Sequence, residues 1–138
     1  MKTKIEAIYD HFKNNFNASI LAGNPTGEII NAFYFGYDPG AISQITPALM
    51  VVPTSSEFNN TVPRKLRAEV NLNIVIIFNE SYVINEQNLL WADKLITFFQ
   101  ADESLGGNSF STDFSNLDFV AAETFGTVDA NFKVNIQV

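Results

Sequence analysis

The sequence predicts an α+β fold, with one antiparallel or mixed sheet of about four strands and two amphipathic helices packed on it. Three observations predict it. Apolar and polar residues alternate over residues 66–78, and residues 5–16 and 89–99 repeat apolar side chains at three- and four-residue spacings. With 138 residues, the chain fits a single domain covering residues 1–138.

The first predicted element is a helix near the N-terminus. Gly23 and Pro25 cannot continue a helix and are expected to end it. His11 lies about 120° from the centre of the apolar face by the helical period, so we expect it to be solvated. The residues that form this face are Ile5, Ile8, Tyr9, Phe12 and Phe16.

The next part of the chain, residues 24–47, is predicted to be an arm or loop. Within it, residues 29–37 are apolar and aromatic, which fits either a short strand or an ordered arm that packs on a neighbour. Residues 48–52 then predict a short buried strand that stops at Pro53. A polar loop is expected over residues 54–63.

The clearest pattern is the long strand at residues 66–78. Its even-numbered positions from Leu66 to Phe78 are apolar, and polar residues fill most of the odd ones. One face of such a strand lies on a core and the other meets water, as antiparallel sheets allow. Val75 and Ile77 are apolar on the outer face, so part of that face should also be covered.

A second helix follows, with Asn85 as the predicted N-cap and Glu86 in its first turn. Its buried stripe is predicted to comprise Leu89, Ala92, Leu95, Ile96 and Phe99. Leu90, Trp91 and Phe98 widen this stripe, and Gly106-Gly107 is expected to form a turn.

The last third of the chain returns to strands. Apolar positions alternate over residues 117–121 and again over residues 130–138. We expect a turn at residues 126–129 between these two strands.

No catalytic site is predicted. The chain has no cysteine and one histidine, so it cannot build a thiolate or two-histidine metal site. Asp102 and Glu103 are neighbours on a predicted solvated surface, and Gly106-Gly107 lacks the lysine and hydroxyl of a phosphate-binding loop. We therefore predict a protein that is not an enzyme and that has no cofactor or metal.

Charge and hydropathy exclude two kinds of partner. The net charge of −7 disfavours binding to a nucleic-acid backbone, and the basic cluster Arg64, Lys65 and Arg67 is too short to form a groove. The longest apolar run, residues 74–78, is far below the ~20 residues that cross a bilayer. The polar start of the chain predicts no signal peptide, and the absence of cysteine suits an intracellular protein or the inside of a particle.

The aromatic residues are the best candidates for an interface. Packing within the chain explains most of them, and the remainder indicate contacts between subunits, where aromatic side chains carry much of the binding energy. These candidates are Phe33, Tyr34, Phe35 and Tyr37 in the arm, and Trp91 and Phe98 on the second helix. The 54–63 loop adds Glu57 and Phe58, and Arg64, Lys65 and Arg67 lie beside it; an ordinary solvated loop is the alternative.

Four sequence segments carry a family resemblance. After the N-terminal helix come "PALMVVP", the strand "LRAEVNLNIVIIFNE", the helix "NLLWADKLITFFQ" and the closing "ANFKVNIQV". This order resembles the tail terminator, or tail completion, proteins of long-tailed bacteriophages, which are similar to head–tail joining proteins. Residues 24–46 are longer and more aromatic than that pattern.

The resemblance implies a virion structural protein of the tail or neck, assembled in the cytoplasm of a bacterial host. It implies a ring, with six copies expected, that caps the tail tube and docks with head or neck connector proteins. DNA would pass through the lumen without specific binding, which suits an acidic chain. The alternative from another class is a small module that binds a ligand or peptide without catalysis.

Overall fold

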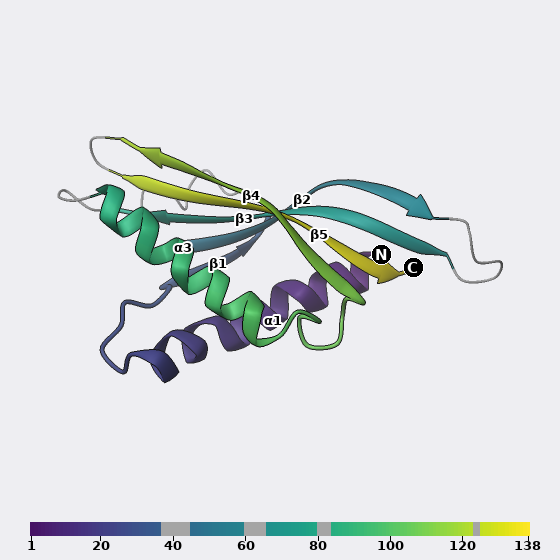
Figure 1. The fold of residues 1–138 in the computed structure, drawn as a ribbon, viewed down its shortest axis with the longest axis horizontal. Helices are drawn as coiled ribbons and strands as arrows, with labels where there is room; N and C mark the ends of the chain where they lie inside the picture. Colours follow the sequence, from purple (N-terminus) through teal and green to yellow (C-terminus); the bar gives the residue numbers. More distant parts are fainter. Residues whose placement is uncertain (37–44, 60–65, 80–83, 123–124) are drawn as a thin grey trace.

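The computed structural model describes residues 1–36, 45–59, 66–79, 84–122 and 125–138 (Figure 1). These residues form two helices and one sheet of five strands, which confirms the α+β class and adds one strand to the predicted number. The elements, in chain order, are α1 (Lys2–Gly23), β1 (Ala32–Phe35), β2 (Ala48–Asn59), β3 (Arg67–Phe78), α3 (Ile84–Ala101), β4 (Ser111–Ala121) and β5 (Gly126–Gln137).

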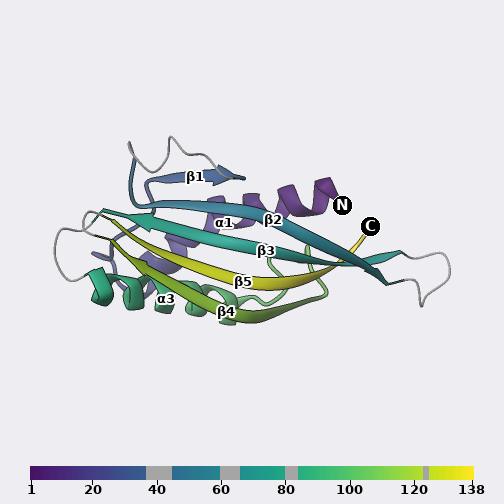
Figure 2. The ribbon, with the colours of Figure 1, turned by 90° about the horizontal axis from the view of Figure 1, so that it is seen from above.

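The strands lie in the order β1-β2-β3-β5-β4, and the sheet is mixed (Figure 2). β1 pairs with β2 in parallel, whereas the other three pairings are antiparallel. Both helices cover one face of the sheet, which we call the helix face (Figure 1). The opposite face is called the open face.

β1 decides between the two alternatives for residues 29–37. Residues 32–35 pair with residues 48–51 of β2, so this part of the chain is a short strand of the protomer's own sheet. Phe33 and Phe35 stand opposite Leu49 and Val51, and therefore share the helix face with them. The Phe35 ring lies 5.5 Å from the ring of Tyr9 in α1.

The predicted polar loop at residues 54–63 is wrong over its first half, because β2 continues to Asn59. Pro53 is tolerated because of its position in the ladder. The amide of Gly36 donates to the carbonyl of Val51, so Val51 faces the edge where β1 ends, and Pro53, two residues on, faces the same edge. Within the described residues no strand pairs with β2 at Pro53 on this edge, so the missing N–H costs no ladder bond there. The register shifts between Pro53 and Ser55, which marks a bulge.

β3 confirms the period of two. Every even-numbered residue from Ala68 to Phe78 is buried, and these side chains meet the helices. On the open face, Ile77 is buried and Val75 half-buried, as predicted from their apolar character. β3 pairs with β2 on one side and with β5 on the other along its whole length, which makes it the centre of the sheet.

The buried stripe of α3 differs from the prediction. Leu89 is exposed, whereas Trp91 and Phe98 are buried along with Ala92, Leu95 and Phe99. Apolar residues occupy so much of this helix that its helical period does not define which face is buried. The buried face is the one that packs against Phe12 and Phe16 of α1. Asn85 lies inside α3, so it does not precede the helix as an N-cap.

The final turn also differs from the prediction. Residues 126–129 belong to β5 and pair with residues 118–121 of β4, so the turn that was expected there is wrong. The chain reverses earlier, where the amide of Ala122 donates to the carbonyl of Phe125. β4 also starts six residues before the predicted alternation, and its register shifts between Phe114 and Asn116.

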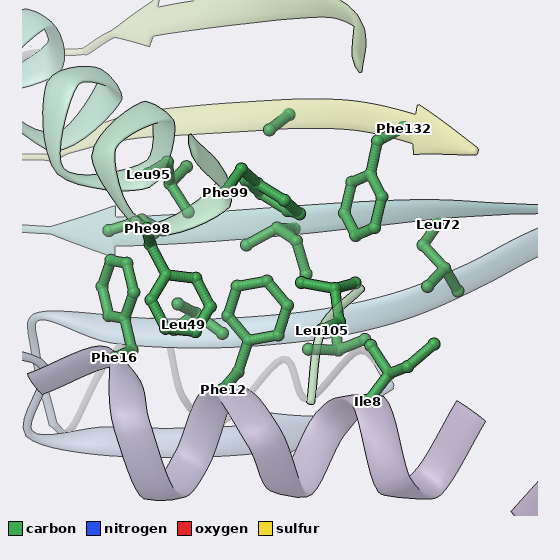
Figure 3. Packing of buried hydrophobic residues seen from close by; sticks show 14 of the residues in the cluster. Ile8, Phe12, Phe16, Leu49, Leu72, Leu95, Phe98, Phe99, Leu105 and Phe132 are labelled. Carbon is green, nitrogen blue, oxygen red and sulfur yellow. The ribbon is translucent and has the colours of Figure 1, made fainter. Parts of the chain in front are cut away.

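Aromatic rings join α1, α3 and the sheet at the centre of the core (Figure 3). The Phe12 ring lies 4.9 Å from Phe98 and 5.5 Å from Phe99, and Phe99 lies 4.7 Å from Phe132 of β5. Pairs at such distances add about 0.5–1.5 kcal/mol each beyond the burial of their area. The two helices are therefore fixed to each other as well as to the sheet.

Candidate interaction surfaces

The structure divides the predicted interface residues into three groups. Tyr37, Arg64 and Lys65 lie outside the described residues. Trp91 and Phe98 are buried in the core of the protomer, so they are not available on its surface. The remaining candidates lie on β1 and at the end of the β2–β3 hairpin.

On β1 the aromatic side chains are already partly used inside the protomer. Phe33 packs against the core, and Phe35 contacts Tyr9 but stays exposed on its other side. Tyr34 stands opposite Met50 on the open face and is half-buried. This short strand therefore offers only a small apolar surface.

The end of the β2–β3 hairpin offers more. Phe58 is 55% exposed, and Leu66 is exposed beside it, where its carbonyl accepts a hydrogen bond from the amide of Val138. The guanidinium of Arg67 lies 4.4 Å from the centre of the exposed Phe110 ring, a stacking contact between a cation and an aromatic face. This end lies near both chain termini (Figure 1).

Sequence reasoning missed a groove between α3 and β4. Its volume is about 370 Å³. It is lined by Ile96, Phe99, Gln100, Glu103, Thr112, Phe114 and Leu117. The signal in the sequence was the excess of apolar residues on α3. The prediction assigned Ile96 and Phe99 to the buried stripe and looked for the interface at Trp91 and Phe98 instead.

The apolar surface of the groove extends toward the N-terminal end of α3. Leu89 precedes Ile96 by seven residues and therefore lies on the same side of the helix; it is 60% exposed. Phe119 follows Leu117 by two residues, faces the same side of β4 and is 45% exposed. Val120, on the opposite side of the strand, is exposed as well. We call the surface on the helix face the α3–β4 seam: Leu89, Ile96, Phe99, Phe114, Leu117 and Phe119.

Acidic side chains outnumber basic ones on the open face of the sheet. Two pairs of carboxylates stand directly opposite each other across neighbouring strands, Glu57 with Glu69 and Asp118 with Asp129. Burial raises the pKa of Asp129, and the nearby Asp118 raises it further. Like charges in this register destabilise a sheet, so selection for stability alone does not explain them.

His11 was predicted to be solvated, and the structure corrects this. Its side chain is only 14% exposed, because it lies against Phe98 and the loop that follows α3. The side-chain nitrogen of Asn15 lies 3.2 Å from Nδ1 of His11, and Nε2 lies 3.9 Å from the Asp102 carboxylate. Burial lowers the pKa of His11, while the Asp102 charge opposes that shift.

Asp102, also predicted to be solvated, organises the loop after α3. One carboxylate oxygen accepts hydrogen bonds from the amide and hydroxyl of Ser104, and the other accepts from the amide of Gly106. These bonds lower the pKa of Asp102. Gly106 and Gly107 have φ angles of +75° and +80°, which confirms the predicted turn. His11 and Asp102 thus join α1 to the end of α3 as a packing element.

Two classes of site were checked over the described part of the chain. No group of three or more His, Asp or Glu side chains there is arranged to hold a metal ion. Within the same residues, neither helix has the length and apolar character that crossing a bilayer requires.

Comparison with known proteins gives a match in fold. By sequence, no family model and no curated protein matches the chain. Among solved structures, a chain in the virion of a native gene transfer agent particle matches with a TM-score of 0.52 and 11% sequence identity. The match covers 97% of this chain and 94% of that one. The two chains share a fold.

Proposed function

We propose that this protein is a structural component of a phage-like virion and that it works by binding other virion proteins, without catalysis. The observation that carries the proposal is the fold shared with a gene transfer agent virion chain over nearly the whole of both chains. The exposed apolar side chains of the seam and the hairpin end support it, because such surfaces are typical of proteins that assemble.

Within that role, we propose that the protein is a tail terminator or head–tail joining protein. It forms a ring, of six copies by analogy with the family it resembles, caps the tail tube and docks with the head or neck connector. The acidic open face supports a position along the path of DNA, because it repels a polyanion and lets it slide without adhering. Its site is then the tail or neck of the particle, assembled in the cytoplasm of the bacterial host.

The test is to add the purified protein to tail tubes assembled from the tube protein of the same particle and to image them in negative stain. We expect density at one end of each tube and a halt in further growth. Tubes that keep growing with bare ends would contradict the terminator role. A chain carrying Leu21→Ser, a change on the exposed side of α1, serves as a control that should still cap.

The groove favours one alternative, a module that binds a peptide or an apolar ligand in the α3–β4 seam. That function predicts saturable binding of a hydrophobic dye by the isolated protein, lost on Phe119→Ser, together with no effect on tubes. Capping of tubes by the same preparation would decide against it.

A further inference from the structure

The α3–β4 seam is large enough to be the apolar centre of an interface. The exposed parts of Leu89, Phe114 and Phe119 amount to on the order of 300 Å², given about 150–250 Å² for a large side chain. A standard interface buries roughly 800 Å² per partner, of which a little over half is apolar. The seam therefore supplies most of the apolar area that one such interface needs.

The two sides of β4 differ in chemistry. On the helix face lies the apolar groove, with Glu103 among its lining residues. On the open face of β4, Asp118 is exposed and stands opposite a second carboxylate, Asp129. A matching partner therefore presents an apolar group toward the helix face and a cation toward the open face.

The end of the β2–β3 hairpin has this arrangement. Phe58 stands opposite Ala68, whose side chain is buried on the helix face, so Phe58 is on that side. Arg67 precedes Ala68 and therefore lies on the open face. The pair of Glu57 and Glu69 lies farther from the tip than Phe58 and Arg67.

We propose that the α3–β4 seam binds the end of the β2–β3 hairpin of a second copy of this chain, with Phe58 and Leu66 over the groove and Arg67 beside Asp118. The proposal rests on the proposed assembly function and names the contact between neighbours. Because the seam and the hairpin end are different surfaces, the contact is head-to-tail, and its repetition closes a ring when the rotation between copies allows.

The dimensions agree. The distal part of β2, residues 53–59, has an outer edge with no strand of the described chain paired to it and spans about 20 Å. The seam follows α3 from Leu89 to Phe99, which is about 15 Å at the helical rise. A hairpin of this length therefore covers the seam from end to end.

The chain contains no cysteine, so engineered cysteines give an unambiguous test. Phe58→Cys and Phe119→Cys are made in separate full-length chains, with Leu21→Cys on α1 as a control. The chains are mixed in pairs and oxidised, both free and bound to tail tubes, and thermal melts by circular dichroism confirm that each is folded. We expect a disulfide-linked dimer from the Phe58→Cys and Phe119→Cys mixture, and little product from either chain alone or from mixtures with the control.

A second measurement needs no disulfide. In sedimentation experiments, Phe58→Ser and Phe119→Ser should each weaken self-association about tenfold or more, because exposed aromatic anchors dominate interfaces. Cross-links only between like positions, or no cross-link either free or on tubes, would overturn the inference. If the protein gives one of these results but still caps tubes, the contact between Phe58 and Phe119 is wrong and the proposed function stands. If the unmodified protein does not cap tubes, the proposed function fails whatever the cross-links show.

Discussion

Replacing Phe12 with alanine removes the ring that connects α1 to α3. Phe12 is fully buried, with ring centroids of Phe16, Phe98 and Phe99 at 6.3, 4.9 and 5.5 Å. Truncation of a buried phenylalanine costs about 3–5 kcal/mol through lost transfer free energy and the cavity left behind. We expect the upper part of that range here, because rings on three sides have fixed positions and cannot collapse into the space.

Urea denaturation followed by circular dichroism measures this cost as a fall in the transition midpoint at constant slope. Phe110→Ala is the matched control: the same atoms are removed from a side chain that is 57% exposed, so the loss should stay below about 1 kcal/mol. A Phe12→Ala variant that loses no more stability than Phe110→Ala would refute the placement of Phe12 at the helix–helix contact.

Three other outcomes are expected. Gly106→Ala should lower the free energy of unfolding by about 1–2 kcal/mol, measured by denaturation, and by more than Gly107→Ala does. Both glycines have a positive φ, but only at Gly106 would the new Cβ meet His11, at 2.9 Å from Nδ1. Equal losses would contradict that contact. Because burial lowers the pKa of His11 in the folded state below 6.5, its contribution to the free energy of unfolding is present above pH 6.5 and is lost as the pH falls through the lowered value. In His11→Gln the fall in stability between about pH 7.5 and about pH 5 should be smaller, and an identical pH profile would show that His11 does not titrate there. Glu57→Lys should raise the melting temperature slightly at low salt by turning the repulsion with Glu69 into attraction, and high salt should remove the gain; a gain that persists at high salt would have another cause.

Much of the fold follows from local pattern. The alternation in β3 and the single apolar face of α1 are each confirmed, because a half-buried strand and a surface helix leave one dominant periodicity in the sequence. The length of β2 could not be predicted. A proline normally ends a strand. β2 continues through Pro53 because β1 ends at Phe35, so no N–H is needed on that edge of β2 at Pro53.

The candidate surfaces were harder to predict than the fold. Trp91 and Leu89 are both apolar residues of α3, and one is fully buried while the other is exposed. The choice between them depends on how α1 packs beside α3, which no local pattern contains. The same holds for His11, which is shielded by a loop that begins 91 residues later in the chain, at Asp102. Composition alone is enough to exclude a two-histidine or thiolate metal site, because the chain has one histidine and no cysteine.

Bulges lie in β4, an outer strand, and in the part of β2 that extends beyond β1, so both affect free edges of the described sheet. β2 is bulged between Pro53 and Ser55, and β4 between Phe114 and Asn116, so neither free edge presents a regular row of donors and acceptors. A regular edge would invite any extended chain to add as a further strand, which is a common route to aggregation. If copies assemble as proposed, through side chains on these irregular edges, the free protein would accumulate to high concentration without adding strands to one another.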